Sequence, residues 1–171
     1  MTNTEQTDDQ KYQAEKKKEH QGRIDHYKKT VVKYNGIVKH IQGLYETAES
    51  QMDDPDGWLK KAEIFGMVLE KVGDLHYISI QAWKYADALK KESYALAIIQ
   101  ERPKGRTTDQ HREMAVLESQ EWRWKIGEWE GLTKRWENAK TTIEEQIKIM
   151  KWKVKWELAN RDQYGMNNQN S

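Results

Sequence analysis

A chain of 171 residues in which 36% of the side chains are hydrophobic and 33% are charged has too little apolar mass for a large spherical core. Cysteine is absent, which excludes disulfides, thiolate metal ligands and a cysteine nucleophile. The net charge of +1 conceals basic blocks at 11–40, 84–106 and 148–161 and an acidic block at 109–145. This composition favours long helices whose narrow apolar faces pack together and whose wide charged faces meet water.

We expect an all-α protein built from elongated helical hairpins or a bundle, with coiled-coil seams and an oligomeric assembly. Residues 1–22 have no periodic apolar face and are predicted to be a polar disordered tail. Residues 23–53 form a predicted heptad helix, an arm for oligomerisation or for a partner, and residues 54–160 form the predicted helical core domain. Residues 161–171 are predicted to be a second disordered tail.

The first predicted helix carries a heptad pattern that is sustained over four repeats. Its apolar side chains recur at alternating steps of three and four: Ile24, Tyr27, Val31, Tyr34, Val38, Ile41, Tyr45, Ala48 and Met52. Gly22, Gly36 and Gly43 are multiples of seven apart, so they share one side of this helix. They either weaken the helix, by about 1 kcal/mol each relative to alanine, or allow another helix to approach closely. The sequence leaves both interpretations open.

Proline and glycine indicate where the next helices begin and end. The segment 53–57 contains a proline and ends the first helix, and its aspartates suit the N-terminus of a second helix over 58–72. Gly73 and Asp74 predict a break or kink, after which a third helix covers 75–99.

The last predicted helix runs from 109 to about 160. Thr107 or Thr108 is expected to cap it, with Asp109 in its first turn. Its inward stripe has the period of a straight α-helix. The stripe consists of Trp122, Ile126, Trp129, Leu132, Trp136, Ala139, Ile143, Ile147, Met150, Val154 and Leu158.

Motifs for catalysis and for metal binding are absent or incomplete in the sequence. The histidines are scattered, and no G-x-S-x-G, H-E-x-x-H or Gly-rich phosphate loop is present. Asp54, Asp56, Gly57 and Glu63 match part of a calcium loop, but Met52 stands at the first position and cannot ligate a hard cation. We therefore interpret this segment as a helix-capping turn and expect no enzyme activity, no metal and no cofactor.

Basic side chains and tryptophans favour a nucleic-acid partner. Cations reach phosphates while aromatic faces offer stacking surfaces to unpaired bases, and this combination favours single strands over duplex. The candidate nucleic-acid-binding residues are Lys84, Lys90, Lys91, Arg102, Lys104, Arg106, Lys151, Trp152 and Lys155. In the alternative interpretation, Trp152 and Trp156 widen the apolar stripe and are buried against another subunit.

Three segments in order carry a family resemblance: SIQAWKYADALKKESYALAIIQERPKGR, GRTTDQHREMAVLES and EWEGLTKRWENAKTTIEEQIKIMKW. Over roughly residues 58–158 this layout resembles the phage recombination mediators of the UvsY type. The resemblance implies a non-enzymatic protein that binds single-stranded DNA and self-associates. Such a protein would help to load a strand-exchange recombinase onto DNA coated by a single-strand-binding protein.

The resemblance also implies roles for particular residues. The family's DNA contacts come from basic residues late in the helix before the turn, which here are Lys90, Lys91, Arg102, Lys104 and Arg106. The uncharged stretch 95–100 departs from that pattern. The family's C-terminal helix serves self-assembly, which implies an oligomer interface made by Ile143, Ile147, Met150 and Val154.

The residues and the resemblance together predict a homo-oligomer that binds single-stranded DNA in recombination, repair or replication. A recombinase and a single-strand-binding protein are candidate partners, and no membrane is expected. The alternative is a structural or adaptor coiled coil that does not bind nucleic acid. The polar N-terminus lacks a secretory signal, which predicts a cytoplasmic location, in the bacterial host cell if the protein is phage-encoded.

Overall fold

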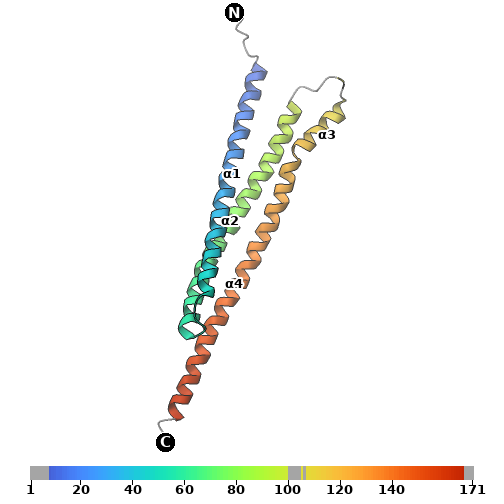
Figure 1. Ribbon diagram of the computed structural model, residues 1–171. Helices are drawn as coiled ribbons and strands as arrows, with labels where there is room; N and C mark the ends of the chain where they lie inside the picture. The colour runs from blue at the N-terminus through green and yellow to red at the C-terminus, as the bar shows by residue number, and fades with distance from the viewer. Residues whose placement is uncertain (1–7, 100–104, 106, 168–171) are drawn as a thin grey trace, which may run out of the picture. The chain divides into compact units, whose positions relative to one another are not determined.

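The computed structural model of the protein describes residues 8–99, 105 and 107–167 (Figure 1). Every regular element in these ranges is an α-helix, which confirms the predicted all-α class. Among the described residues, no helix has an apolar stretch long enough to cross a bilayer.

The helices have uninterrupted interiors because neither proline of the chain falls inside one of them. Pro55 is the first residue of its helix, where a missing backbone N–H costs nothing, and Pro103 comes between two helices in the sequence. The helices in chain order are α1 (Asp8–Glu49), α2 (Pro55–Ile99), α3 (Thr108–Glu118) and α4 (Gln120–Asn167).

The chain divides into two compact units, each of which combines segments that are far apart in the sequence. Among the described residues, unit 1 comprises 8–33, 78–99, 105 and 107–132, and unit 2 comprises 34–77 and 133–167. These boundaries differ from the predicted division at 53 and 54, because α1, α2 and α4 each contribute a segment to both units.

The core of unit 1 is built around Tyr27 of α1. Its ring meets the rings of Trp122 and Trp129 of α4 edge-on, at centroid distances of 5.3 and 6.4 Å. The Trp129 indole Nε1–H donates a buried hydrogen bond of 2.8 Å to the Tyr27 hydroxyl. Leu89 and Ile78 of α2 complete the core with almost no exposed surface. Aromatic area thus replaces the aliphatic side chains in which the sequence is poor.

Unit 2 repeats the tyrosine–tryptophan pairing with other residues. The Trp136 Nε1–H donates to the Tyr34 hydroxyl at 3.0 Å, and this pair has the same sequence separation of 102 residues as the pair in unit 1. Tyr45 packs against Phe65 with ring centroids 5.5 Å apart. Leu75 is fully buried in the same unit.

The predicted heptad face of α1 is buried by the chain's own helices. Tyr27, Tyr34, Ile41 and Ala48 all belong to the core. Met52 is the exception at 72% exposed, because it follows the end of α1 and lies in the turn before α2. The inward assignment of this face is confirmed for the helix and is wrong for Met52.

The acidic turn between α1 and α2 caps the second helix. The Asp54 carboxylate accepts the Gly57 backbone N–H at 2.7 Å, and the Asp54 carbonyl accepts the Trp58 N–H at 2.8 Å. A Cβ on Gly57 would overlap the Met52 carbonyl oxygen, so glycine is needed at this close approach. The structure agrees with the helix-capping interpretation of this segment.

The predicted break at Gly73 and Asp74 is wrong, because α2 is continuous from Pro55 to Ile99. Val72 and Leu75 on either side are buried, and their packing holds the helix across the exposed glycine. Burial of neighbouring apolar side chains outweighs the propensity cost of about 1 kcal/mol for one glycine.

The predicted last helix is divided at Ser119, which separates α3 from α4. Ser119 is buried, its hydroxyl donates to the Val116 carbonyl at 2.9 Å, and its N–H donates to the Ala115 carbonyl. The predicted N-cap is confirmed at Thr107, whose side chain and that of Gln110 form a capping box.

The described parts of both predicted tails are helical. α1 begins at Asp8, so residues 8–22 are helical, and α4 continues to Asn167. In unit 1 the early part of α1 contacts the end of α2: the Gln13 side chain donates to the Ile99 carbonyl at 3.4 Å. Such tertiary contacts supply stabilisation that the polar sequence alone does not predict.

Candidate nucleic-acid interface

A shallow hollow on unit 1 brings three basic side chains and one aromatic ring together. The hollow is lined by Lys90, Lys91 and Tyr94 of α2, by Ser119 between α3 and α4, and by Arg123 of α4. The hollow has a volume of about 340 Å³. We call it the basic hollow.

The lysines of the basic hollow share one carboxylate. Asp87 lies one turn earlier on α2, at 2.9 Å from the Lys90 ammonium and 2.7 Å from that of Lys91. The hydrogen bonds from Lys90 and then Lys91 hold the pKa of Asp87 below its usual value. With three cations and one carboxylate, the cluster of Lys90, Lys91, Arg123 and Asp87 keeps a net charge of +2.

Arg123 is the third cation of the basic hollow. It is exposed and has no ion-pair partner among the described residues. Its backbone N–H donates a hydrogen bond of 3.3 Å to the Ser119 carbonyl, and Arg123 thus lies on the first turn of α4. Trp124, the next residue, is largely exposed. The Arg123 guanidinium lies beside two lysines that share one carboxylate. Such a guanidinium can bind a phosphate, because arginine donates two N–H groups in a fixed geometry.

Of the four other candidates between residues 84 and 106, the structure describes Lys84 alone. Lys84 is exposed and lies two turns before Lys91 on the same side of α2, but it does not line the hollow. Arg102, Lys104 and Arg106 lie outside the described residues.

The α4 candidates belong to unit 2. Lys151, Trp152 and Lys155 are all exposed to solvent. Neither lysine has an ion-pair partner among the residues that the structure describes. The described candidates are thus divided between the units, with Lys84, Lys90 and Lys91 in unit 1 and the three α4 residues in unit 2.

The residues assigned to an oligomer interface are packed within their own unit to different extents. Ile143 is 2% exposed and Val154 is 7% exposed, whereas Ile147 and Met150 are half-buried. Ile143 and Val154 therefore have little surface left for a second copy, and the interface stays a prediction.

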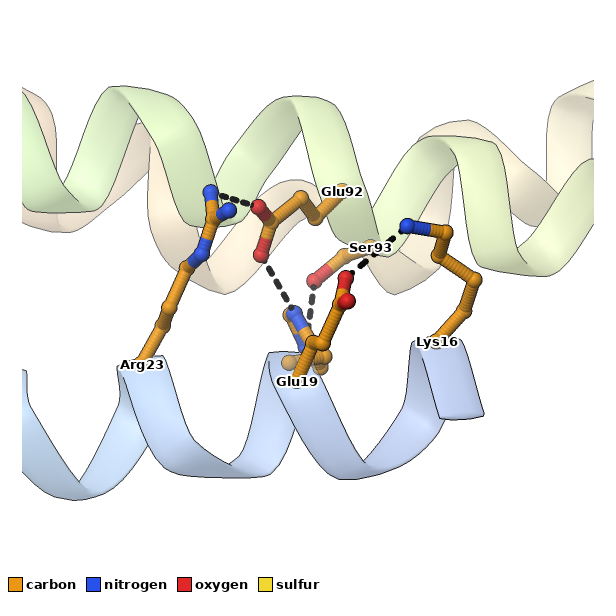
Figure 2. A network of polar contacts seen from close by, with 6 residues as sticks. Lys16, Glu19, Arg23, Glu92 and Ser93 are labelled. Atoms are coloured by element: carbon orange, nitrogen blue, oxygen red, sulfur yellow. Dashed lines mark hydrogen bonds and ion pairs between the residues drawn. The ribbon is translucent and has the colours of Figure 1, made fainter. Parts of the chain in front are cut away.

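A polar network in unit 1 joins the start of α1 to α2 close to the basic hollow. Figure 2 shows Arg23 of α1 reaching toward Glu92 of α2, with which it forms an ion pair. His20 Nδ1 lies 3.2 Å from the Glu92 carboxylate, and His20 Nε2 lies 3.3 Å from the Ser93 hydroxyl. Glu92 and Ser93 follow Lys91 directly, so the network fixes the part of α2 that carries the hollow's lysines.

The contacts of His20 with Ser93 and Glu92 resemble the catalytic triad of a serine hydrolase. The surroundings of these three residues favour a structural role instead. Ser93 lies inside α2, where backbone N–H groups are engaged in the helix and cannot stabilise an oxyanion. The Glu92 carboxylate that faces His20 also forms an ion pair with Arg23. The adjoining hollow of about 190 Å³ is little more than half the size of the basic hollow.

Sequence reasoning missed Tyr94 and Arg123. Tyr94 could have been found, because it lies three residues after Lys91 on the same side of a predicted helix. Arg123 falls in the acidic block at 109–145, and only the tertiary packing of α4 beside α2 brings it to the lysines.

No protein-family model matches the chain, and neither the curated proteins nor the solved structures contain a match.

Proposed function

We propose that the protein binds single-stranded DNA in recombination or replication, without catalysis. The observation that carries this proposal is the basic hollow, which Lys90, Lys91 and Arg123 line together with Tyr94. Its size lies at the lower end of the roughly 300–1,000 Å³ typical of small-ligand pockets, which suits one segment of a polymer.

The chemistry of the hollow matches a flexible polyanion. Lys91 and Arg123 can approach phosphates from different elements, α2 and α4, and release the counterions condensed on the strand. Tyr94 is 38% exposed and offers its ring to an unpaired base. The finer role, loading of a recombinase onto coated single strands by a homo-oligomer, rests on the resemblance to the phage mediators.

Fluorescence anisotropy with a labelled oligothymidylate tests the proposal at low and moderate salt. We expect salt-sensitive binding that weakens when Lys90, Lys91 and Arg123 are changed to Ala. The slope of log affinity against log salt should become shallower by about 0.7 for each phosphate that the variant no longer neutralises. Lys140→Ala is the control, because Lys140 is an exposed lysine of α4 outside the hollow.

One observation favours the adaptor alternative: Asp87 already pairs with two of the three cations of the hollow. In that case the charges serve solubility and helix stability, as exposed i, i+3 and i, i+4 pairs commonly do. The alternative is supported if the native protein does not bind the oligonucleotide at any salt concentration.

A further inference from the structure

The outer side of α4 in unit 2 exposes a row of large apolar side chains. Ile149 is 54% exposed, Trp152 is 64% exposed and Trp156 is 55% exposed. Ile143 and Val154 of the same helix point into the core of the unit. A contiguous exposed patch of large apolar side chains often marks a binding surface. We call Ile149, Trp152 and Trp156 the tryptophan face.

Each member of the tryptophan face is preceded by a lysine in the sequence. The three basic–apolar pairs are Lys148–Ile149, Lys151–Trp152 and Lys155–Trp156. The pairs follow one another at steps of three and four residues, so the lysines recur on one flank of the face. With a rise of about 1.5 Å per residue, the two tryptophans are about 6 Å apart along α4.

The charge on this surface is largely unneutralised. Lys148 pairs with Glu145 at 2.7 Å, but Lys151 and Lys155 have no ion-pair partner in the described part of the chain. Two copies of the face packed together would bring these like charges into contact. The surface is therefore complementary to an anion and is a poor interface for a second copy.

We propose that the tryptophan face is a second binding site for single-stranded nucleic acid, at which two unpaired bases contact Trp152 and Trp156. Lys151 and Lys155 neutralise the phosphates on the flank. This inference rests on the proposed function and adds to it the source of the preference for single strands, which phosphate contacts alone do not supply.

The position of the two tryptophans along α4 leads us to expect that a duplex does not use this site. Bases in a duplex stack at about 3.4 Å and hide their faces, whereas the tryptophans recur at about 6 Å. Only a strand whose bases are free to separate can place one base against each ring. Each base–ring contact should strengthen single-strand binding about tenfold.

The test compares single-stranded and duplex oligonucleotides binding to the full chain with Trp152 and Trp156 both changed to Ala, to Leu or to Phe. Phe keeps an aromatic ring and should retain most of the single-strand affinity. Leu keeps apolar area without a ring and should weaken binding as much as Ala does, about 100-fold if both bases contribute. Duplex affinity and the salt slope should stay as in the native protein.

Helical content by circular dichroism and mass in solution are measured for every variant. Native single-strand affinity in the Ala and Leu variants would overturn the inference. So would a fall in oligomeric mass, which would make the face a self-association surface, or tryptophan-dependent binding to anionic phospholipid vesicles.

The same titration separates this inference from the proposed function. If the native protein binds the strand through Lys90, Lys91 and Arg123 but the tryptophan variants bind equally well, only the second site is refuted. If the native protein does not bind a strand at all, the proposed function itself is refuted.

Discussion

At the residue scale, two tyrosine–tryptophan hydrogen bonds join α1 to α4 at defined positions. Tyr27 with Trp129 in unit 1 and Tyr34 with Trp136 in unit 2 place the same two residue types on α1 and α4 at one sequence offset. An apolar contact tolerates small shifts of one helix along another, but a buried indole donor requires its acceptor. These pairs therefore specify the register of α4 against α1 within each unit.

Replacing Tyr27 by Phe should destabilise the chain without changing its helical content. The substitution removes the acceptor that the Trp129 indole uses in the core, at a cost of about 1–3 kcal/mol. Urea unfolding followed by circular dichroism measures the change. Tyr12→Phe is the control, because Tyr12 is exposed and its ring contact with Lys16 is kept. Equal stability of the two variants would show that this hydrogen bond does not stabilise the fold.

Alkaline pH should unfold the protein through its buried tyrosines. Burial raises the pKa of Tyr27, Tyr34 and Tyr45 above the usual value. A raised folded-state pKa means that the stabilisation is complete below about pH 10 and disappears as pH rises through the folded-state value. The thermal midpoint should fall in that range, and less steeply in Tyr27→Phe. If absorbance shows that these phenols have the usual tyrosine pKa in the folded protein, the prediction is wrong.

At the scale of the helices, the sequence predicts apolar faces well and helix ends less well. The heptad face of α1 is in the core as expected, because periodic burial dominates helix placement. Gly73 does not break α2, since buried neighbours carry the helix across it. The division at Ser119 could not be predicted, because no proline or glycine marks it in the sequence.

The cap of α2 can be tested at Asp54. Changing Asp54 to Ala removes the acceptor for the Gly57 N–H and should cost about 0.5–2 kcal/mol. Asp54→Asn keeps an acceptor oxygen and should be destabilised much less. Urea unfolding of the two variants measures the difference. Equal destabilisation in both would mean that the aspartate acts through its charge at the helix N-terminus rather than as a cap.

At the scale of the whole molecule, the candidate site was only partly predictable. Lysine-rich sequence indicated the α2 residues, and alternation of lysine with tryptophan indicated those of α4. The contribution of Arg123 depends on tertiary packing of α4 beside α2, and the pairing of Asp87 depends on side-chain geometry. The sequence therefore predicts a polyanion as the class of partner, but it does not predict the full set of side chains that line the candidate site.

The most direct test of nucleic-acid binding is the affinity of the native chain and of Asp87→Asn for a labelled oligothymidylate across a salt series. The substitution removes the carboxylate that pairs with Lys90 and Lys91 and raises the charge of the basic hollow. We expect binding by the native chain that weakens linearly with log salt, and several-fold tighter binding by Asp87→Asn at low salt. Absence of binding at every salt concentration, or equal affinity of the two chains, would contradict the account.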